Sequence, residues 1–177
     1  MGASNASCRR CERGASVDVL RVRNVSDLTC YSAVVVGSAI HSDRWLSEAS
    51  DFVIQNRKVL SRVPVAYFLT CLTLAHPTEE NRQKALGFLN PLTREAPEVT
   101  PVDTGLFAGV LDYDKLSFMV RMVMKVKMKD KGVEEGDYRD WPSIRSWAYG
   151  IAPRLLNGRR IAASRPGGRA SRSASAA

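Results

Sequence analysis

The stretch from residue 31 to residue 53, YSAVVVGSAIHSDRWLSEASDFV, constrains the fold of this chain more than any other feature. Its first part, residues 31–36, is an apolar run rich in valine, which is typical of a strand covered on both faces. The small residues 37–39 leave room for a turn or for a closely approaching ligand, and Ser47 can cap a following helix. Open α/β sheets bind ligands at such strand–loop–helix junctions, although an ordinary turn explains the same pattern.

The rest of the chain alternates between strand and helix patterns. Further strands are predicted at residues 16–22, 65–74 and 102–111, and glycines interrupt the last of them at Gly105 and Gly109. Helices are predicted from Thr78 to about residue 90, over residues 115–129, and after the capping sequence Asp140-Trp141-Pro142. This alternation predicts an α/β fold with a mainly parallel, doubly wound sheet.

The composition is that of one globular domain. The 177 residues include 45% apolar and 25% charged residues, and no apolar run approaches the length of a membrane span. The first residues lack the apolar stretch of a secretory signal, so we expect a cytoplasmic protein without a transmembrane segment. Cys8 and Cys11 form an isolated C-x-x-C pair that no second pair completes, so no metal site is expected. Cys30 and Cys71 fit small core positions.

The net charge of +8 is concentrated near the two ends of the chain. Residues 157–177 hold five arginines and no acidic residue, and residues 1–13 hold three arginines against Glu12, so residues 14–156 carry only +1. A nucleic-acid-binding domain carries its basic surface on the fold itself, so no specific nucleic-acid partner is expected. We therefore predict an irregular segment at 1–13, one folded domain at 14–156 and a disordered basic tail at 157–177.

Residues 115–131 have the pattern of a basic amphipathic helix. Arg121, Lys125 and Lys129 recur every four residues, and apolar residues such as Phe118, Met122 and Val126 occupy another part of the helix surface. Such a helix suits an anionic membrane surface, and modest, salt-sensitive binding to anionic vesicles is the corresponding expectation. The alternative is a surface helix that packs on the sheet and holds its lysines in solvent.

Four segments in succession resemble the flavodoxin-like family, and within it the protoporphyrinogen IX dehydrogenase branch. They are YSAVVVGSAIHSDRWLSEASDFV, PVAYFLTCLTL, GLFAGVLDYDKLSFMVRMVMK and DYRDWPSIRSWAYGIA, and the resemblance covers about residues 12–156. It implies a flavodoxin fold that binds FMN non-covalently at the C-terminal ends of the strands. It also implies the two-electron oxidation of a porphyrinogen, with a membrane quinone as acceptor, by a protein peripheral to the inner face of the cell membrane.

The same resemblance implies the cofactor-binding residues. The loop against the isoalloxazine ring corresponds to Gly37, Ser38, Ala39, Ile40 and His41, and the second loop on the flavin side corresponds to Thr70, Cys71, Leu72 and Thr73. Trp45 either shields the ring or packs against the following helix, and packing is the more common role of tryptophan. No catalytic side chain is predicted, because the ring supplies the redox chemistry.

The start of the chain departs from the family pattern. The family begins with a strand and a phosphate-binding loop rich in serine and threonine, whereas here the familiar pattern begins at about Glu12. We therefore expect an N-terminally truncated flavodoxin-like sheet that lacks its first strand, and weak FMN binding by the chain as written. The alternative is a degenerate flavodoxin fold without a cofactor, acting as an interaction module or as a non-functional remnant.

Overall fold

The computed structural model describes residues 8–10, 16–115, 117–130 and 132–163. Its centre is a four-stranded sheet in the order β4-β3-β5-β6. The strands are β3 (Val34–His41), β4 (Arg44–Trp45), β5 (Val65–Cys71) and β6 (Asp103–Ala108). β3, β5 and β6 are parallel, and the short β4 is antiparallel to β3. The predicted α/β fold with a mainly parallel sheet is confirmed.

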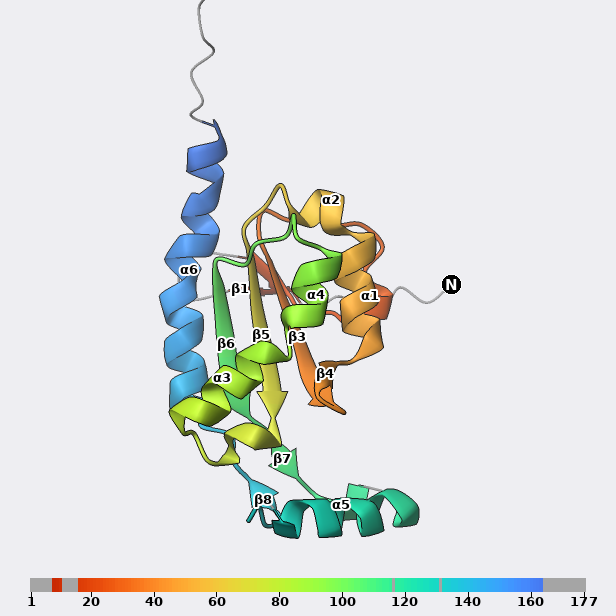
Figure 1. The fold of residues 1–177 in the computed structure, drawn as a ribbon. Helices are drawn as coiled ribbons and strands as arrows, with labels where there is room; N and C mark the ends of the chain where they lie inside the picture. The colour runs from red at the N-terminus through yellow and green to blue at the C-terminus, as the bar shows by residue number, and fades with distance from the viewer. Residues whose placement is uncertain (1–7, 11–15, 116, 131, 164–177) are drawn as a thin grey trace, which may run out of the picture.

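One face of the sheet carries the main hydrophobic core. Four helices cover it (Figure 1): α1 (Ser47–Gln55), α2 (Arg57–Leu60), α3 (Glu79–Gly87) and α4 (Asn90–Glu95). Alternate residues of β3 and β5, such as Val36 and Leu69, point into this core and meet Val53 and Leu60 from the helices. Thr78 caps α3 as predicted, because its hydroxyl oxygen accepts a hydrogen bond from the Asn81 backbone N–H at 3.2 Å.

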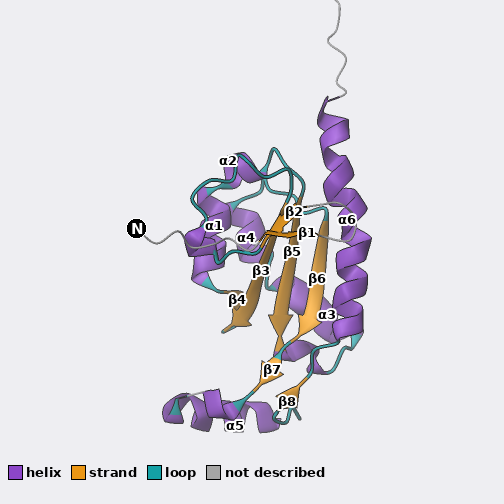
Figure 2. Cartoon of the chain, turned by 180° about the vertical axis from the view of Figure 1, so that it is seen from behind, coloured by secondary structure: helices purple, strands orange, loops and turns teal. Residues whose placement is uncertain are grey.

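On the opposite face one long helix, α6 (Trp141–Ala163), runs along β6 at one side of the sheet, as the view from behind shows (Figure 2). Trp147 packs edge-on against Phe68 and Phe107 of the sheet, with ring centroids 6.2 Å and 5.4 Å away. The Trp147 indole N–H also donates a hydrogen bond to the Asp103 carboxylate at 2.8 Å, and Arg154 forms an ion pair with the same carboxylate. Asp103 therefore anchors α6 to the sheet at two points, which lie two helical turns apart.

The prediction that β3 is covered on both faces is wrong. Val35, on the face that α6 shares, keeps 44% of its surface exposed, because α6 lies over β5 and β6 rather than over β3. The outer edge of β3 is also open. It pairs with β4 only at Ile40 and His41, and no strand of the described part of the chain pairs with residues 34–39 on that side. This unpaired edge agrees with the expectation of a sheet that lacks its first strand.

The N-terminal strands form a separate hairpin. β1 (Cys8–Arg10) pairs antiparallel with β2 (Ser16–Asp18), and neither belongs to the main sheet. The strand predicted at residues 16–22 is therefore shorter than expected, and the 3₁₀ turn η1 (Val22–Asn24) follows it. Within the segment that was expected to be irregular, residues 8–10 form a strand, and residues 1–7 and 11–13 lie outside the described residues.

Several other predicted boundaries move. The strand expected at residues 65–74 ends at Cys71 and continues as the 3₁₀ turn η2 (Leu72–Ala75). The helix expected to stop near residue 90 ends at Gly87, and α4 begins at Asn90 because Pro91 is favourable in a first helical turn. Asp140 caps α6 as predicted, since its carboxylate accepts from the Ser143 N–H and hydroxyl. The helix continues to Ala163, beyond the expected tail boundary at residue 157, and residues 164–177 are not described.

The long fourth strand divides at Gly109, as its glycines suggested. Beyond this residue β7 (Val110–Leu111) leaves the main sheet and pairs with β8 (Gly136–Asp137). Between β7 and β8 the chain forms the turn η3 (Tyr113–Lys115) and the helix α5 (Phe118–Asp130). Figure 1 shows this segment extending beyond the end of the sheet where β3, β5 and β6 finish.

We expect Asp103→Ala to lower the free energy of unfolding by about 1–2 kcal/mol, because it removes the Trp147 hydrogen bond and the Arg154 ion pair together. The matched control is Asp137→Ala, which removes the exposed ion pair of Asp137 with Arg139 and should change the stability much less. Urea unfolding followed by tryptophan fluorescence measures both. Equal losses for the two variants would show that Asp103 does not anchor α6.

The turn between β3 and β4 gives a second prediction. Ser42 and Asp43 both have positive φ angles, 51° and 60°, as in the two-residue turns of tight hairpins, in which glycine is favoured. Asp43→Gly should therefore stabilise the chain by up to about 1 kcal/mol in urea unfolding. The same exchange at Ser61, where φ is −68°, should destabilise it. A loss of stability in Asp43→Gly would contradict the strain at this turn.

Candidate functional site

The parallel register of the sheet brings the two segments of the predicted site together. Ala39 of β3 lies directly opposite Thr70 of β5, and Thr70 lies opposite Phe107 of β6. His41 ends β3, and Leu72 and Thr73 begin the turn that follows β5. Segments that are about thirty residues apart in the sequence therefore meet at the C-terminal edge of the sheet, where α/β proteins bind ligands.

The first segment is not a loop. Residues 37–41 continue β3, and the actual turn is the pair Ser42 and Asp43, which leads straight into β4. The strand continues because β5 supplies a partner for each residue up to Ala39, and β4 pairs with the two residues that follow. Consequently alternate residues point to opposite faces of the sheet, and one face only of this segment is available to a ligand.

The two faces divide the predicted residues. Ser38 is buried, its hydroxyl donates to the Ala39 carbonyl at 2.8 Å, and it accepts from the Leu46 N–H at 3.0 Å. Ser38 thus connects β3 by a hydrogen bond to Leu46, the residue just before α1. Ala39 and His41, on the opposite face, are exposed. Ile40 is partly buried and packs against the main core.

The space above Gly37 is already filled by the protein. A Cβ atom at Gly37 would lie 1.9 Å from Cζ of Phe68, so the missing side chain accommodates this aromatic ring. Phe68 in turn belongs to the cluster with Phe107 and Trp147 that holds α6. Gly37 was expected to make room for a ligand. On this face it makes room for Phe68 instead, and Ala39 is the small residue that stays exposed.

Trp45 packs in the core, which was the second of its two expected roles. Only 5% of its surface is exposed, and its ring meets Tyr67 edge-on at a centroid distance of 5.3 Å. Its indole N–H is buried and has no hydrogen-bond partner among the described residues. Burial also raises the pKa of the Tyr67 phenol to about 12. Both aromatic residues are therefore packing groups that are uncharged at neutral pH.

The two described cysteines that were expected in the core differ in exposure. Cys71 is buried at the end of β5, and burial raises the pKa of its thiol. The protonated thiol is a poor nucleophile, so Cys71 is a packing residue rather than a reactive one. Cys30 is exposed, contrary to the prediction, because it lies in the turn before β3 rather than beside a strand. Thr70, Leu72 and Thr73, next to Cys71, are partly exposed.

Two hollows flank this edge of the sheet. The larger, of about 360 Å³, lies along the open edge of β3 and is lined by residues 20–23, residues 37–39 and the start of α1. The smaller, of about 200 Å³, lies beyond the end of β5 and is lined by Leu72, Thr73, His76, Asn81, Lys84 and Val133. The last four residues were not predicted. Asn81 and Lys84 lie on α3 and Val133 lies far along the chain, so no local pattern marks them.

The exposed residues at the strand ends suit a flat, partly apolar ring better than a phosphate group. Ala39 and Leu72 offer apolar surface, and Thr70 and Thr73 offer hydroxyl groups. A phosphate normally requires backbone N–H groups at a helix N-terminus. The helices α1 and α3 instead carry acidic residues in their first turns, Glu48 in α1 and both Glu79 and Glu80 in α3, and these repel an anion.

Two further kinds of site are absent from the described part of the chain. No group of three or more histidine, cysteine or acidic residues is arranged there to hold a metal ion. No described helix is both long enough and apolar enough to cross a membrane.

Comparison with known proteins bears on the whole of this architecture. A flavodoxin domain model matches residues 5–137. Protoporphyrinogen IX dehydrogenase [quinone] from Leishmania major is 27% identical to this chain over 130 residues, which is 71% of the chain and 55% of the relative. The chain thus spans a little over half the length of that relative, and no solved structure matches it significantly. The domain match agrees with the parallel sheet and with the helices on its two faces. The chain belongs to the flavodoxin family.

Proposed function

We propose that this chain is an FMN-type flavin-dependent oxidoreductase whose flavin ring lies against the C-terminal ends of β3 and β5. The observation that carries the proposal is the register that sets exposed Ala39 beside Thr70, at the edge where this family of folds binds ligands. When bound, a flavin supplies the two-electron chemistry, taking up a hydride equivalent from one substrate and passing electrons to another.

The side chains at this edge would bind and orient the ring. Ala39 is small enough to let a planar group approach the strand, and Leu72 offers an apolar contact. The hydroxyl groups of Thr70 and Thr73 can donate hydrogen bonds to ring oxygen and nitrogen atoms or accept them from its N–H. His41 is exposed at the end of β3 and is the only titratable residue of this strand. Ser38, Trp45 and Cys71 would support these residues from the buried side.

We further propose a porphyrinogen as electron donor and a quinone as acceptor. The name of the Leishmania relative specifies both protoporphyrinogen IX and a quinone, and the flavodoxin domain match over residues 5–137 includes the predicted site residues. Quinones are lipid-soluble, so a protein without a described membrane-spanning helix would meet one by associating with the inner face of the cell membrane from the cytoplasm.

A cofactor-free role is the second candidate. Two observations favour it: the outer edge of β3 is unpaired along residues 34–39 within the described structure, and acidic residues occupy the first turns of α1 and α3. An open parallel edge presents free backbone groups that another strand can pair with. In that case the fold would serve as an interaction module without redox chemistry, or would be a non-functional remnant.

Flavin titration separates the two candidates. We expect the purified chain to bind FMN weakly and riboflavin almost as well, because the acidic first turns of α1 and α3 repel the phosphate. The phosphate would then lack charge-assisted hydrogen bonds worth about 1.5–3 kcal/mol each. Quenching of flavin fluorescence measures both affinities. Tight FMN binding with a strong preference over riboflavin would contradict this prediction, and no binding of either flavin would favour the cofactor-free role.

Arg21 and Arg23 line the larger hollow, so replacing both with alanine tests whether they hold the phosphate.

The position of the ring can be tested with one matched pair of variants. Ala39→Arg should weaken riboflavin binding at least about tenfold, because a bulky charged side chain would occupy the surface on which the ring rests. Val35→Arg places the same side chain on the same face of β3, but near the other end of the strand, away from the site. It should change the riboflavin affinity by less than about twofold. Equal effects of the two variants in the fluorescence titration would place the ring elsewhere.

A further inference from the structure

Helix α5 is held away from the main sheet by a small core of its own. This core contains Leu111, Tyr113, Met128 and Val133, and packed against it are Met124, Tyr138 and, from the turn η2 after β5, Leu72 and Ala75. It thus combines the inner side of α5 with the turn η3 and the segment that leads to β8. The alternative expectation, that α5 packs on the sheet, is not what the structure shows, and the apolar residues on its other side have no such cover.

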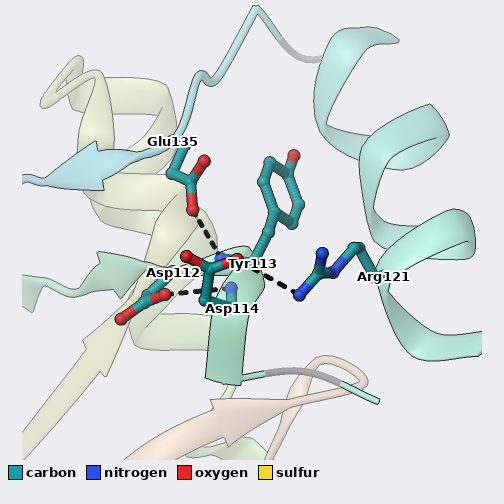
Figure 3. A network of polar contacts seen from close by, with 5 residues as sticks. All are labelled: Asp112, Tyr113, Asp114, Arg121 and Glu135. Atoms are coloured by element: carbon teal, nitrogen blue, oxygen red, sulfur yellow. Dashed lines mark hydrogen bonds and ion pairs between the residues drawn. The ribbon is translucent and has the colours of Figure 1, made fainter. Parts of the chain in front are cut away.

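A polar network surrounds the turn η3 and connects it to α5 through Arg121 (Figure 3). Arg121 donates to the Asp114 carboxylate at 3.2 Å. The Asp112 carboxylate accepts from the Asp114 N–H at 3.0 Å, and the Glu135 carboxylate accepts from the Tyr113 N–H at 2.7 Å. Arg121 is therefore paired with a carboxylate rather than a free cation, whereas the side chain of Asp114 stays 91% exposed and Glu135 is also exposed.

The outer side of α5 is a stripe of exposed apolar residues. The exposed fractions are 73% for Phe118, 74% for Met119, 58% for Met122, 65% for Val123 and 66% for Val126. The positions i, i+1, i+4, i+5 and i+8 lie on one side of an α-helix, so the five side chains form one continuous surface. We refer to these five residues as the α5 stripe. Single exposed apolar residues need no explanation, but a contiguous stripe marks an interaction surface.

Cationic groups border the stripe. Lys125 and Lys129 follow Phe118 by seven and eleven residues, which places both on the flank of the stripe nearest Phe118 and Met122. Lys129 is exposed, and the Lys125 ammonium lies 5.4 Å from the centre of the Tyr113 ring, at the boundary between the inner core and solvent. Lysines beside an apolar helix surface can extend their charge towards lipid phosphates while the apolar side chains enter the lipid.

We propose that α5 docks parallel to an anionic membrane surface, with the stripe inserted at the boundary of headgroups and acyl chains. Lys125 and Lys129 would then lie at the level of the phosphates. A second copy of the chain fits this surface less well, because its own α5 would bring the same exposed lysines, Lys125 and Lys129, and like charges repel one another. The proposal extends the membrane partner of the proposed function, but it requires no flavin and is tested without one.

Co-sedimentation with vesicles tests the docking. The chain should bind vesicles that contain phosphatidylserine, bind pure phosphatidylcholine vesicles more weakly, and lose affinity as salt is raised. The variant Val123→Glu with Val126→Glu should lose at least about tenfold in affinity, because it removes apolar surface and adds repulsive charge. The control variant, Val19→Glu with Leu156→Glu, adds the same charge at exposed apolar residues elsewhere and should change the affinity less than about twofold.

A second pair of double variants tests the contribution of the lysines to vesicle binding. Lys125→Glu with Lys129→Glu should abolish the preference for phosphatidylserine, whereas Lys58→Glu with Arg62→Glu, an equal charge change on exposed residues elsewhere, should largely keep it. Circular dichroism checks that each variant is folded, and Val123→Gln with Val126→Gln replaces the glutamate variant if that one unfolds.

Three results would overturn the proposal: no vesicle binding by the unmodified chain, equal losses in a variant and its control, or a dimer in sedimentation velocity that only the stripe variants dissociate. The last result would assign the stripe to a second copy of the chain. Flavin titration of the same variants keeps this test separate from that of the proposed function, since loss of vesicle binding with unchanged flavin affinity affects the docking surface alone.

Discussion

The in-register parallel pairing of β3 with β5 is the constraint on which the rest of this structure depends. It runs without interruption from Val34 opposite Val65 to Ala39 opposite Thr70, and β6 extends it on the far side of β5. Because parallel strands finish at the same edge, this pairing alone decides which residues meet there. It also sets the alternation by which Val36 and Ser38 enter the main core while Val35 and Ala39 face the other way.

The two faces of the sheet are unequally covered, and this inequality explains the character of the candidate site. Four helices bury one face, whereas α6 holds only β5 and β6 on the other through Trp147 and the carboxylate of Asp103. The outer part of β3 is left with an exposed surface at Ala39 and an unpaired backbone edge. A planar ring can use such a surface, but a phosphate needs converging N–H groups, and the acidic first turns of α1 and α3 oppose it. The fold thus favours the ring side of a flavin over its phosphate side.

Local signals in the sequence predicted much of the fold. The valine-rich run of β3, the threonine cap of α3, the aspartate cap of α6 and the strand break at Gly109 all act through neighbouring residues, and the structure confirms each of them. The tight turn at Ser42 and Asp43 was missed because it lacks the glycine or asparagine that usually marks such a turn. Residues 37–41 were expected as a loop because Gly37 ends the apolar run and because these residues resemble a loop of the family, whereas the structure continues β3 through them.

The other misses depend on contacts that no local pattern contains. Periodicity identified two sides of α5, but whether its apolar side is covered depends on where Gly109 directs the chain. The space beside Gly37 is filled by Phe68, a residue from the next strand, and the hollow with His76 and Lys84 is completed by Val133. The predicted site residues were therefore brought to one edge as expected, whereas their division into buried supports and exposed contacts required the three-dimensional structure.

The central claim is that the exposed ends of β3 and β5 form a surface for a flavin ring. Amide chemical-shift changes during addition of riboflavin to the isotopically labelled chain test it most directly, because they report weak binding residue by residue. The account predicts shifts at Ala39 and His41 and at residues 70–73, and none at Val35, at the other end of the same strand. Shifts confined to residues 20–23, or spread evenly over the chain, would contradict it.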